Sequence, residues 1–194
     1  MRQPDFSALR RWPNVPACYG WLSLDRRGRW RMRDELVTHR GLNDFLNRQY
    51  ARDEMGNHFV QNGPQRVFVE LEYTPWVLRL ASDGGFETHT GEADIDIQAA
   101  VLDDEGNLLL EIPQGIALVC DRDLPELLPH LQLPDGDADG VAHLLAAIEG
   151  GGVDYLLLDW QGRRLPVRWL CRSEVPARYG FVASPQAPLP GGPG

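Results

Sequence analysis

Alternating apolar and polar positions are clearest in the stretch from Asn57 to Leu80. From Val67 to Tyr73 every second residue is apolar, and this period-2 pattern predicts a strand with one buried face. Asn62-Gly63 precedes it and favours a tight hairpin turn. Thr74-Pro75 interrupts the pattern, because proline has no N–H to donate, and the alternation resumes at Trp76. We therefore predict a three-stranded antiparallel sheet with one apolar face.

Three further hairpins are predicted where the motif Leu-Asp-x-x-Gly recurs, at Leu24, Leu102 and Leu158. Aspartate begins such a turn by accepting hydrogen bonds from the backbone ahead of it, and glycine ends it in a left-handed conformation. Ile95, Ile97 and Ala99 alternate before the second of these turns and predict its first strand. The repetition indicates either one favourable turn used three times or a duplicated lobe.

Helical periodicity is predicted in a few short segments. Thr38 is the expected N-cap of a helix that carries Leu42, Phe45, Leu46 and Tyr50 on one stripe and ends at Gly56-Asn57. A short helix follows Asp123, and another follows a polar linker at 132–140. We predict an α+β protein with antiparallel sheets, few short helices and two similar lobes. Its segments are an N-terminal lobe (1–56), a central antiparallel lobe (57–131), a helix-plus-hairpin extension (132–183) and a disordered tail (184–194).

Charge is distributed unevenly along the chain, whose net charge is −9. Residues 1–66 hold twelve arginines against seven acidic residues, a net of +5, and residues 67–194 carry a net of −14. Every one of the nineteen basic residues is arginine. Arginine binds phosphate and carboxylate in a planar, bidentate way, although the nucleotide composition of a genome gives the same bias. Overall acidity excludes broad, non-specific DNA coating and leaves a local basic patch in the first third.

Cysteine usage and hydropathy indicate the compartment. Cys18, Cys120 and Cys171 are odd in number, far apart and in no spacing typical of a zinc site. The first residues contain no apolar run typical of a signal peptide, and no segment approaches the roughly 20 apolar residues needed to cross a bilayer. We expect a soluble cytoplasmic protein without a membrane partner.

Five motifs follow one another in register: Leu-Asp-x-x-Gly-x-Trp (24–30), Val-Thr-His-Arg (37–40), His58 to Val67, Val69 to Trp76, and Thr-His-Thr-Gly-Glu (88–92). In this order, over about residues 19–131, they resemble an uncharacterised bacterial family, domain-of-unknown-function family 1285. The resemblance implies a duplicated core whose second half is loosely similar to a pleckstrin-homology fold. It also implies a binding protein with a nucleic-acid-like ligand between the halves and a role in signalling or RNA metabolism. Residues 132–194 have no counterpart in this comparison.

The resemblance also points to particular residues at the join between lobes. The family pairs an arginine before the first helix, a basic residue in the long strand, and an acidic residue before a proline and an aromatic. The matching residues are Arg40, Arg66, Glu72 and Trp76. There the arginines would bind phosphate, Glu72 would orient an arginine and Trp76 would stack. The alternative is an internal ion pair that closes the interface.

A second candidate for binding comes from the residues alone. Arg29, Arg31 and Arg33 share one face of a predicted strand, beside Trp21 and Trp30. Arginines with neighbouring aromatics bind single-stranded nucleic acid through phosphate contacts and base stacking. Because Trp30 alternates with the arginines, the alternative is a solvated strand face over core tryptophans.

Two acidic patterns are candidate metal sites. Asp135, Asp137 and Asp139 match the first half of a calcium loop, but position 12 is Ala146 rather than a bidentate glutamate, and a solvated linker is the alternative. Asp94 and Asp96 are predicted on one side of a strand, near Glu92 and His89, where they could serve a metal-dependent hydrolase or simply face solvent.

Catalytic motifs are missing from the sequence: there is no nucleophile elbow and no phosphate-binding glycine loop. We therefore expect a non-catalytic binding or regulatory protein without a cofactor, whose partner is a nucleotide- or RNA-like phosphate ligand. A protein-interaction or dimerisation module without a small ligand is one alternative. A metal-dependent hydrolase at Asp94 and Asp96 is the other, and the oligomeric state is open.

Overall fold

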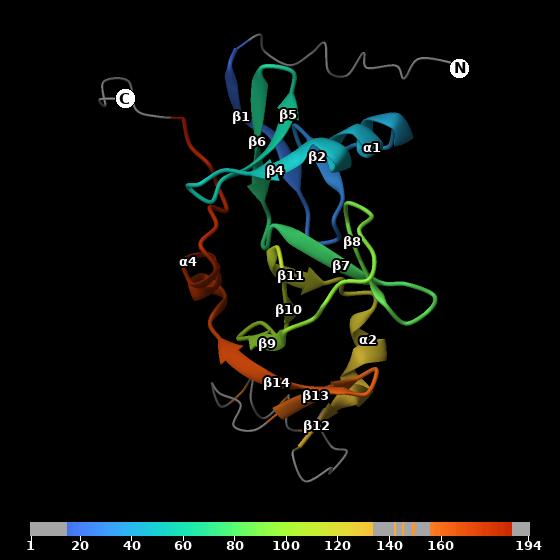
Figure 1. Cartoon of the computed structure of the whole chain (residues 1–194). Helices are drawn as coiled ribbons and strands as arrows, with labels where there is room; N and C mark the ends of the chain where they lie inside the picture. The colour runs from blue at the N-terminus through green and yellow to red at the C-terminus, as the bar shows by residue number, and fades with distance from the viewer. Residues whose placement is uncertain (1–14, 134–141, 143–144, 146–148, 150–155, 188–194) are drawn as a thin grey trace. The chain divides into compact units, whose positions relative to one another are not determined.

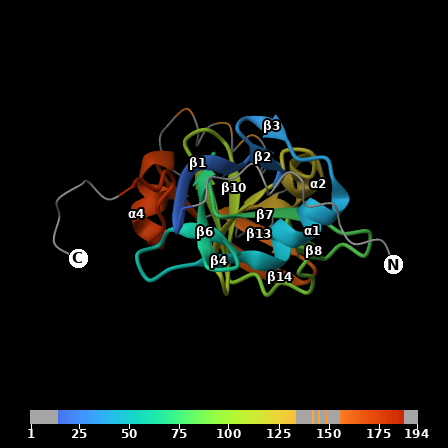
Figure 2. The ribbon, with the colours of Figure 1, turned by 90° about the horizontal axis from the view of Figure 1, so that it is seen from above.

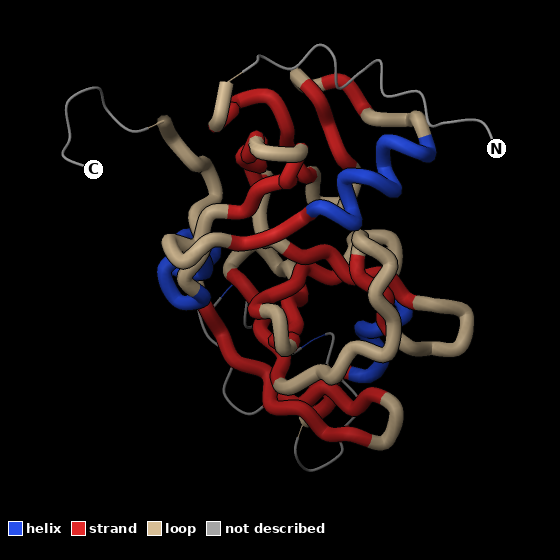
Figure 3. Tube along the Cα trace, turned by 45° about the horizontal axis from the view of Figure 1, so that its top comes forward, coloured by secondary structure: helices blue, strands red, loops and turns tan. Residues whose placement is uncertain are grey.

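The chain folds into two compact units. The structure is a computed structural model that describes residues 15–133, 142, 145, 149 and 156–187. Unit 1 comprises Met1–Pro75 and Gly180–Gly194, and unit 2 comprises Trp76–Tyr179. In sequence, unit 2 is therefore inserted between two parts of unit 1. Strands predominate over short helices among the described residues, which confirms the α+β class (Figure 3).

Unit 1 contains a six-stranded sheet in the order β3-β2-β1-β6-β5-β4. Its strands are β1 (Ala17–Leu24), β2 (Trp30–Met32), β3 (Glu35–Leu36), β4 (Tyr50–Arg52), β5 (His58–Asn62) and β6 (Gln65–Leu71). β1 and β6 are parallel and lie side by side (Figure 1), and the other neighbours are antiparallel. β2 and β3 form one edge of this sheet (Figure 2). The sheet is thus mixed, whereas the sequence predicted antiparallel pairing alone.

Helix α1 (Arg40–Gln49) packs on unit 1 through Leu42 and Leu46, both buried. Its N-cap is His39 rather than the predicted Thr38, because the His39 Nδ1 accepts the N–H of Leu42 at 3.1 Å. The helix ends sooner than predicted, since Tyr50 already begins β4. An amphipathic stripe predicted the helix correctly, but its ends depend on local hydrogen bonds.

Asp-x-x-Gly turns recur, with one hydrogen-bond pattern. Asp25, Asp53 and Asp103 each accept the backbone N–H groups two and four residues ahead on Oδ1, at 2.8–3.0 Å. The glycine of each turn has a positive φ, which a side chain disfavours. The Asp53 turn was not predicted: Gly56-Asn57 was assigned to the end of the helix. Its motif, Asp-x-x-Gly-Asn, also occurs at residues 103–107.

Two hairpin turns differ from the prediction. Asn62 pairs with Gln65, so the central residues of that turn are Gly63 and Pro64, not Asn62 and Gly63. Glycine in the first central position is typical of a type II′ turn. In the third Leu-Asp-x-x-Gly hairpin, Trp160 pairs with Arg163, and the turn consists of two residues, 161 and 162. The sequence motif alone therefore does not determine which type of turn a hairpin has.

Unit 2 contains an eight-stranded sheet in the order β12-β13-β14-β9-β10-β11-β7-β8. Its strands are β7 (Trp76–Leu80), β8 (Phe86–Thr88), β9 (Ala99–Asp103), β10 (Leu108–Ile112), β11 (Gly115–Val119), β12 (Leu131–Gln132), β13 (Leu156–Trp160) and β14 (Arg163–Leu170). β7 is parallel to β11, and β14 is parallel to β9. The helical segments that the structure describes over their whole length are α2 (Leu124–Leu127), η2 (Leu128–His130), η3 (Arg172–Glu174) and α4 (Val175–Tyr179). Leu102, Leu110 and Leu158 are fully buried in one apolar core.

The structure divides the chain at other points than the sequence predicted. The first part of unit 1 ends at Pro75, and β7 pairs with β11 of unit 2 instead of extending the sheet of residues 57–71. No boundary falls at residue 56, because β4 and β5 pair across it. The predicted extension shares the core of unit 2, since Leu158 and Val167 pack with Leu102.

The last described residues return to unit 1. Ala183 accepts the N–H of Leu71 at 2.8 Å, and Val182 donates to Gly56 at 3.0 Å. Phe181 and Pro185 are buried. The tail that the sequence predicted to be disordered starts at Ser184, directly after this packed segment. Its residues 188–194 lie outside the described residues. So do the Asp135–Gly140 loop and most of the helix predicted after it.

Candidate functional site

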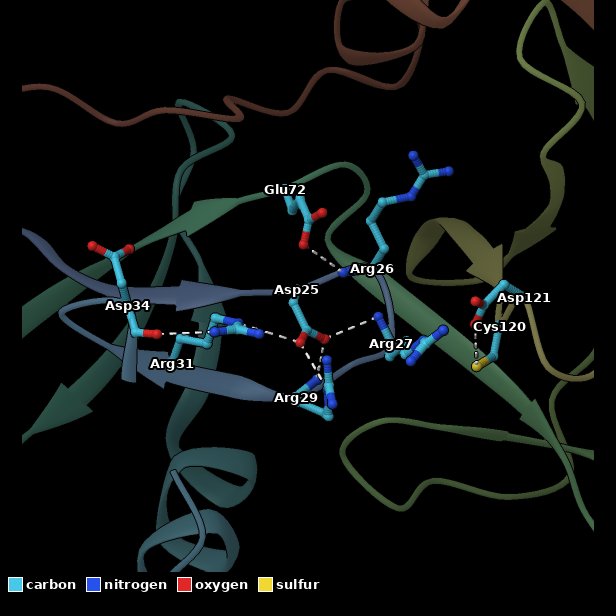
Figure 4. Close-up of polar contacts among 9 residues, drawn as sticks. All are labelled: Asp25, Arg26, Arg27, Arg29, Arg31, Asp34, Glu72, Cys120 and Asp121. Carbon is cyan, nitrogen blue, oxygen red and sulfur yellow. Dashed lines mark hydrogen bonds and ion pairs between the residues drawn. The ribbon is translucent and has the colours of Figure 1, made fainter. Parts of the chain in front are cut away.

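The strands β1 and β2 and the turn between them carry a basic cluster, which we call the arginine hairpin (residues 21–33). Residues 25–33 hold five arginines and one aspartate, a net charge of +4. Asp25 is the centre of the cluster: its Oδ2 accepts from Arg29 Nε at 2.8 Å and lies 3.5 Å from Arg31 Nε (Figure 4). The Asp25 side chain is 5% exposed, and the two arginines are 38% and 36% exposed. A nearly buried carboxylate thus fixes two half-exposed guanidinium groups.

These contacts leave terminal nitrogens of the two arginines available. Within the part of the chain that the structure describes, Arg29 makes its side-chain hydrogen bond through Nε alone. Arg31 also donates from Nη1 to the Asp34 carbonyl at 2.9 Å, which leaves its Nη2. The planar fork of guanidinium N–H groups suits phosphate oxygens. The hairpin therefore presents oriented donors for an anion.

Arg33 does not continue the strand but turns onto Trp21. It has a φ of 48°, and with Asp34 it forms the two-residue turn between β2 and β3. The Arg33 guanidinium carbon lies 3.4 Å from the centre of the Trp21 ring, a cation–π stack. No carboxylate pairs with Arg33 among the described residues. Trp30 is 2% exposed and donates from Nε1 to Asn47 Oδ1 at 2.6 Å, so it is a core residue, as its alternation with the arginines predicted.

A pocket of about 520 Å³ lies next to Arg33. Its walls come from the edge of the sheet and the start of α1: Trp21, Met32, Arg33, Glu35, Leu36, Val37, Thr38, His39 and Leu42. This volume is within the range of small-molecule sites, roughly 300–1,000 Å³. The lining combines apolar side chains with a few polar groups, which is typical of such sites.

The other predicted residues are dispersed. Arg66 begins the exposed end of β6, with its guanidinium 4.7 Å from the Phe59 ring centre, whereas Glu72 follows the far end of that strand. They are six residue steps apart along the strand, about 20 Å, so one small ligand cannot contact both. Glu72 Oε2 accepts the Arg26 N–H at 3.1 Å, so it holds the hairpin turn. Arg40 is exposed at the start of α1.

Trp76 and the acidic cluster belong to unit 2. Trp76 packs against the core of that unit, 5.6 Å from the His89 ring. The strand predicted over Ile95, Ile97 and Ala99 begins only at Ala99, as β9, so Asp94 and Asp96 precede it; Asp94 has a φ of 56°, and Asp96 pairs with Arg163 at 2.7 Å. Among the described residues, no three His, Cys, Asp or Glu side chains are arranged to hold a metal ion. The calcium-loop residues Asp135, Asp137 and Asp139 lie outside the described part.

Comparison with known proteins places the chain in a family. The model of domain-of-unknown-function family 2944, described as "Protein of unknown function (DUF2946)", matches residues 1–186. The chain belongs to this family. No functionally curated protein matches its sequence significantly. Within the described ranges, no helix is both long enough and apolar enough to cross a membrane.

Solved structures of family-1285 proteins are similar to this family-2944 chain. The protein from Silicibacter pomeroyi DSS-3 has a TM-score of 0.52 and 15% identity, over 87% of this chain and 89% of that chain. The protein from Shewanella baltica OS155 has a TM-score of 0.41 and 14% identity, over 54% and 87%. The first likeness confirms the resemblance to family 1285 at the level of the fold. Since it covers 87% of the chain, it extends well beyond residue 131, where the resemblance in sequence ended.

Sequence reasoning missed Asp25 as part of the site and missed the pocket. Asp25 was assigned only to a turn, and the signal that it does more is the pair of arginines four and six residues ahead. The pocket residues Glu35 to Thr38 lie in a segment without clear periodicity, so only the folded chain brings them next to Arg33.

Proposed function

We propose that this protein is a non-catalytic binding protein whose arginine hairpin holds a nucleotide- or RNA-like phosphate ligand. The observation that carries the proposal is the Asp25 carboxylate, which fixes Arg29 and Arg31 through Nε at 2.8 and 3.5 Å. Fixed guanidinium groups lose less conformational entropy on binding than free ones. Their remaining N–H donors form charge-assisted hydrogen bonds to phosphate.

Charge and stacking support the same ligand class. The hairpin carries a net charge of +4, although the whole chain is acidic, so attraction for an anion is local. The Arg33 guanidinium carbon lies over the Trp21 ring, 3.4 Å from its centre, and a guanidinium group can also stack with a base. Because the arginines are more than one third exposed, salt screens them, and binding should weaken as ionic strength rises.

Binding measured by calorimetry at low and high salt tests the proposal, with nucleoside triphosphates and short RNA oligomers as probes. We expect Arg31→Ala to weaken binding several-fold, because it removes one oriented donor group. Arg48→Ala is the matched control, since Arg48 is an exposed arginine of α1 outside the hairpin. Absence of binding by all probes, or equal losses in the two variants, would overturn the proposal.

A protein-interaction role is the second candidate. Its supporting observation is the edge strand β3, where Leu36 is 42% exposed at the border of the sheet. An exposed edge strand can pair with another chain. Sedimentation analysis distinguishes this candidate: a dimer that Leu36→Lys dissociates supports pairing through β3, whereas a monomer at all concentrations argues against self-association.

A further inference from the structure

We propose that the pocket beside Arg33 is the subsite for the base of the ligand, and that Glu35 makes it prefer guanine. This inference rests on the proposed function, because it assumes that the arginine hairpin holds the phosphates of the same nucleotide. It adds a specific ligand class, a guanine nucleotide, and a residue that selects it.

The pocket has the size and lining for a flat ring. Its volume of about 520 Å³ exceeds what a nucleobase needs. Met32, Leu36, Val37 and Leu42 supply apolar contacts that favour a ring over a fully hydrated group. Arg33 adds a planar guanidinium, already stacked on Trp21, against which a base can stack.

Glu35 gives the pocket its selectivity. It is the sole carboxylate among the lining residues, and an ionised carboxylate accepts hydrogen bonds but donates none. Guanine presents two neighbouring donors, N1–H and the N2 amino group, which a carboxylate can accept together. Uracil presents one N–H between two carbonyl oxygens, and the carboxylate repels these two oxygens. Adenine and cytosine, with one amino group each, should lie between.

Other polar groups at the pocket do not reverse this preference. His39 uses Nδ1 to accept the N–H of Leu42 at 3.1 Å, so a neutral His39 carries its proton on Nε2, and this donor suits a carbonyl oxygen of guanine and of uracil alike. Thr38 has a hydroxyl, which both donates and accepts and so discriminates little between bases. We therefore expect Glu35 to determine the order of affinities of the pocket for the four bases.

The pocket and the phosphate donors are at a suitable spacing for one nucleotide. Arg33 lines the pocket, and Arg31 lies two residues earlier, in the middle of β2, at most about 7 Å away along the chain. This distance is comparable with that between a base and its own phosphates. A base in the pocket thus leaves its phosphates next to Arg31.

Calorimetry with guanosine triphosphate, uridine triphosphate and inorganic tripolyphosphate tests the inference. We expect the guanine nucleotide to bind about tenfold more tightly than the uracil nucleotide, as for a good bidentate contact to a base. Glu35→Gln should reduce this ratio to about twofold or less. Glu54→Gln, which changes an exposed glutamate outside the pocket, should leave it unchanged.

The outcomes separate the two proposals. Equal affinity for all three probes, still lowered by Arg31→Ala, would overturn the base subsite and leave the proposed function intact. A guanine preference that survives Glu35→Gln would overturn the role of Glu35. If none of these three probes binds, the base subsite is overturned, and the proposed function fails as well only if the short RNA oligomers also do not bind.

Discussion

Asp25 combines two roles in one side chain. Its Oδ1 accepts two backbone N–H groups of the turn, and its Oδ2 accepts from Arg29. We expect Asp25→Asn to lower the free energy of unfolding by about 1–2 kcal/mol, because the amide keeps a turn acceptor but turns an N–H donor towards the arginines. Denaturant titration measures this. Asp44→Asn, at an exposed position of α1, is the control and should stay within about 0.5 kcal/mol of wild type.

His58 is a buried histidine of β5. It is 2% exposed, and its Nδ1 has no hydrogen-bond partner in the described part of the chain. Burial, together with the nearby Arg52 charge, lowers the pKa of His58 to about 4. In the unfolded chain the pKa of histidine is about 6.5, so between these values the unfolded state binds more protons and stability rises with pH.

The pH dependence of unfolding therefore has a definite sign. The contribution of neutral His58 is complete above about pH 6.5 and is lost as the pH falls to about 4, by at most about 3 kcal/mol. Denaturant titrations from pH 7 to pH 5 should show wild-type stability falling more steeply than that of His58→Leu. Parallel curves for the two proteins would contradict a low pKa for His58.

For single residues, the sequence predicted correctly whether a side chain is buried where that depends on the alternation along a strand. The alternation of Trp30 with its neighbours placed it in the core, where it is 2% exposed. The alternation did not show that Arg29 and Arg31 share Asp25, because the contact depends on how the turn directs the carboxylate across the hairpin.

The turn between β2 and β3 is an element with unfavourable local geometry. Arg33 and Asp34 have φ values of 48° and 67°, in the region where asparagine and glycine are favoured. An arginine at such a position carries backbone strain that asparagine or glycine would not.

Replacement of Arg33 by asparagine should separate stability from binding. Arg33→Asn relieves backbone strain but removes the cation–π contact with Trp21, so we expect the free energy of unfolding to stay within about 1 kcal/mol of wild type. Nucleotide affinity should fall several-fold. A variant that loses stability by several kcal/mol, or that binds nucleotides as wild type does, would contradict this assignment.

Among elements, antiparallel hairpins were predictable and parallel pairs were not. The Asp-x-x-Gly turns at 25 and 103 are local, so a few residues specify them. The parallel pairing of β1 with β6 joins residues that are nearly 50 positions apart in the sequence, such as Leu24 and Leu71. No local pattern encodes that choice of partner, because it depends on which apolar faces share a core.

At the scale of the whole molecule, unit 1 is completed by residues from both sides of unit 2. Composition indicated a disordered C-terminal end, since prolines and glycines dominate it. The segment from Gly180 to Ala183, which directly precedes the predicted disordered tail, hydrogen-bonds to Gly56 and Leu71. Sequence reasoning could not show this contact, because it joins segments more than 100 residues apart and depends on a close approach of two backbones at a glycine.

Gly56 is the residue that permits this approach. It has a φ of 83°, and a Cβ there would lie 2.3 Å from the Gly180 carbonyl oxygen. Gly63 also has a positive φ, 57°, but a Cβ there would meet nothing within 4 Å. Comparison of Gly56→Ala with Gly63→Ala therefore isolates the contact with the C-terminal segment from the cost of the backbone conformation alone.

We expect Gly63→Ala to lower the free energy of unfolding by about 1–2 kcal/mol, the cost of a left-handed conformation, and Gly56→Ala to lower it by clearly more, because backbone atoms must move apart. Hydrogen exchange locates the difference. The amides of Leu71 and Val182, which bond across the contact, should exchange faster in Gly56→Ala only, while those of β9 and β10 in unit 2 stay protected. Equal losses in the two variants would mean that the returning segment contributes little to unit 1.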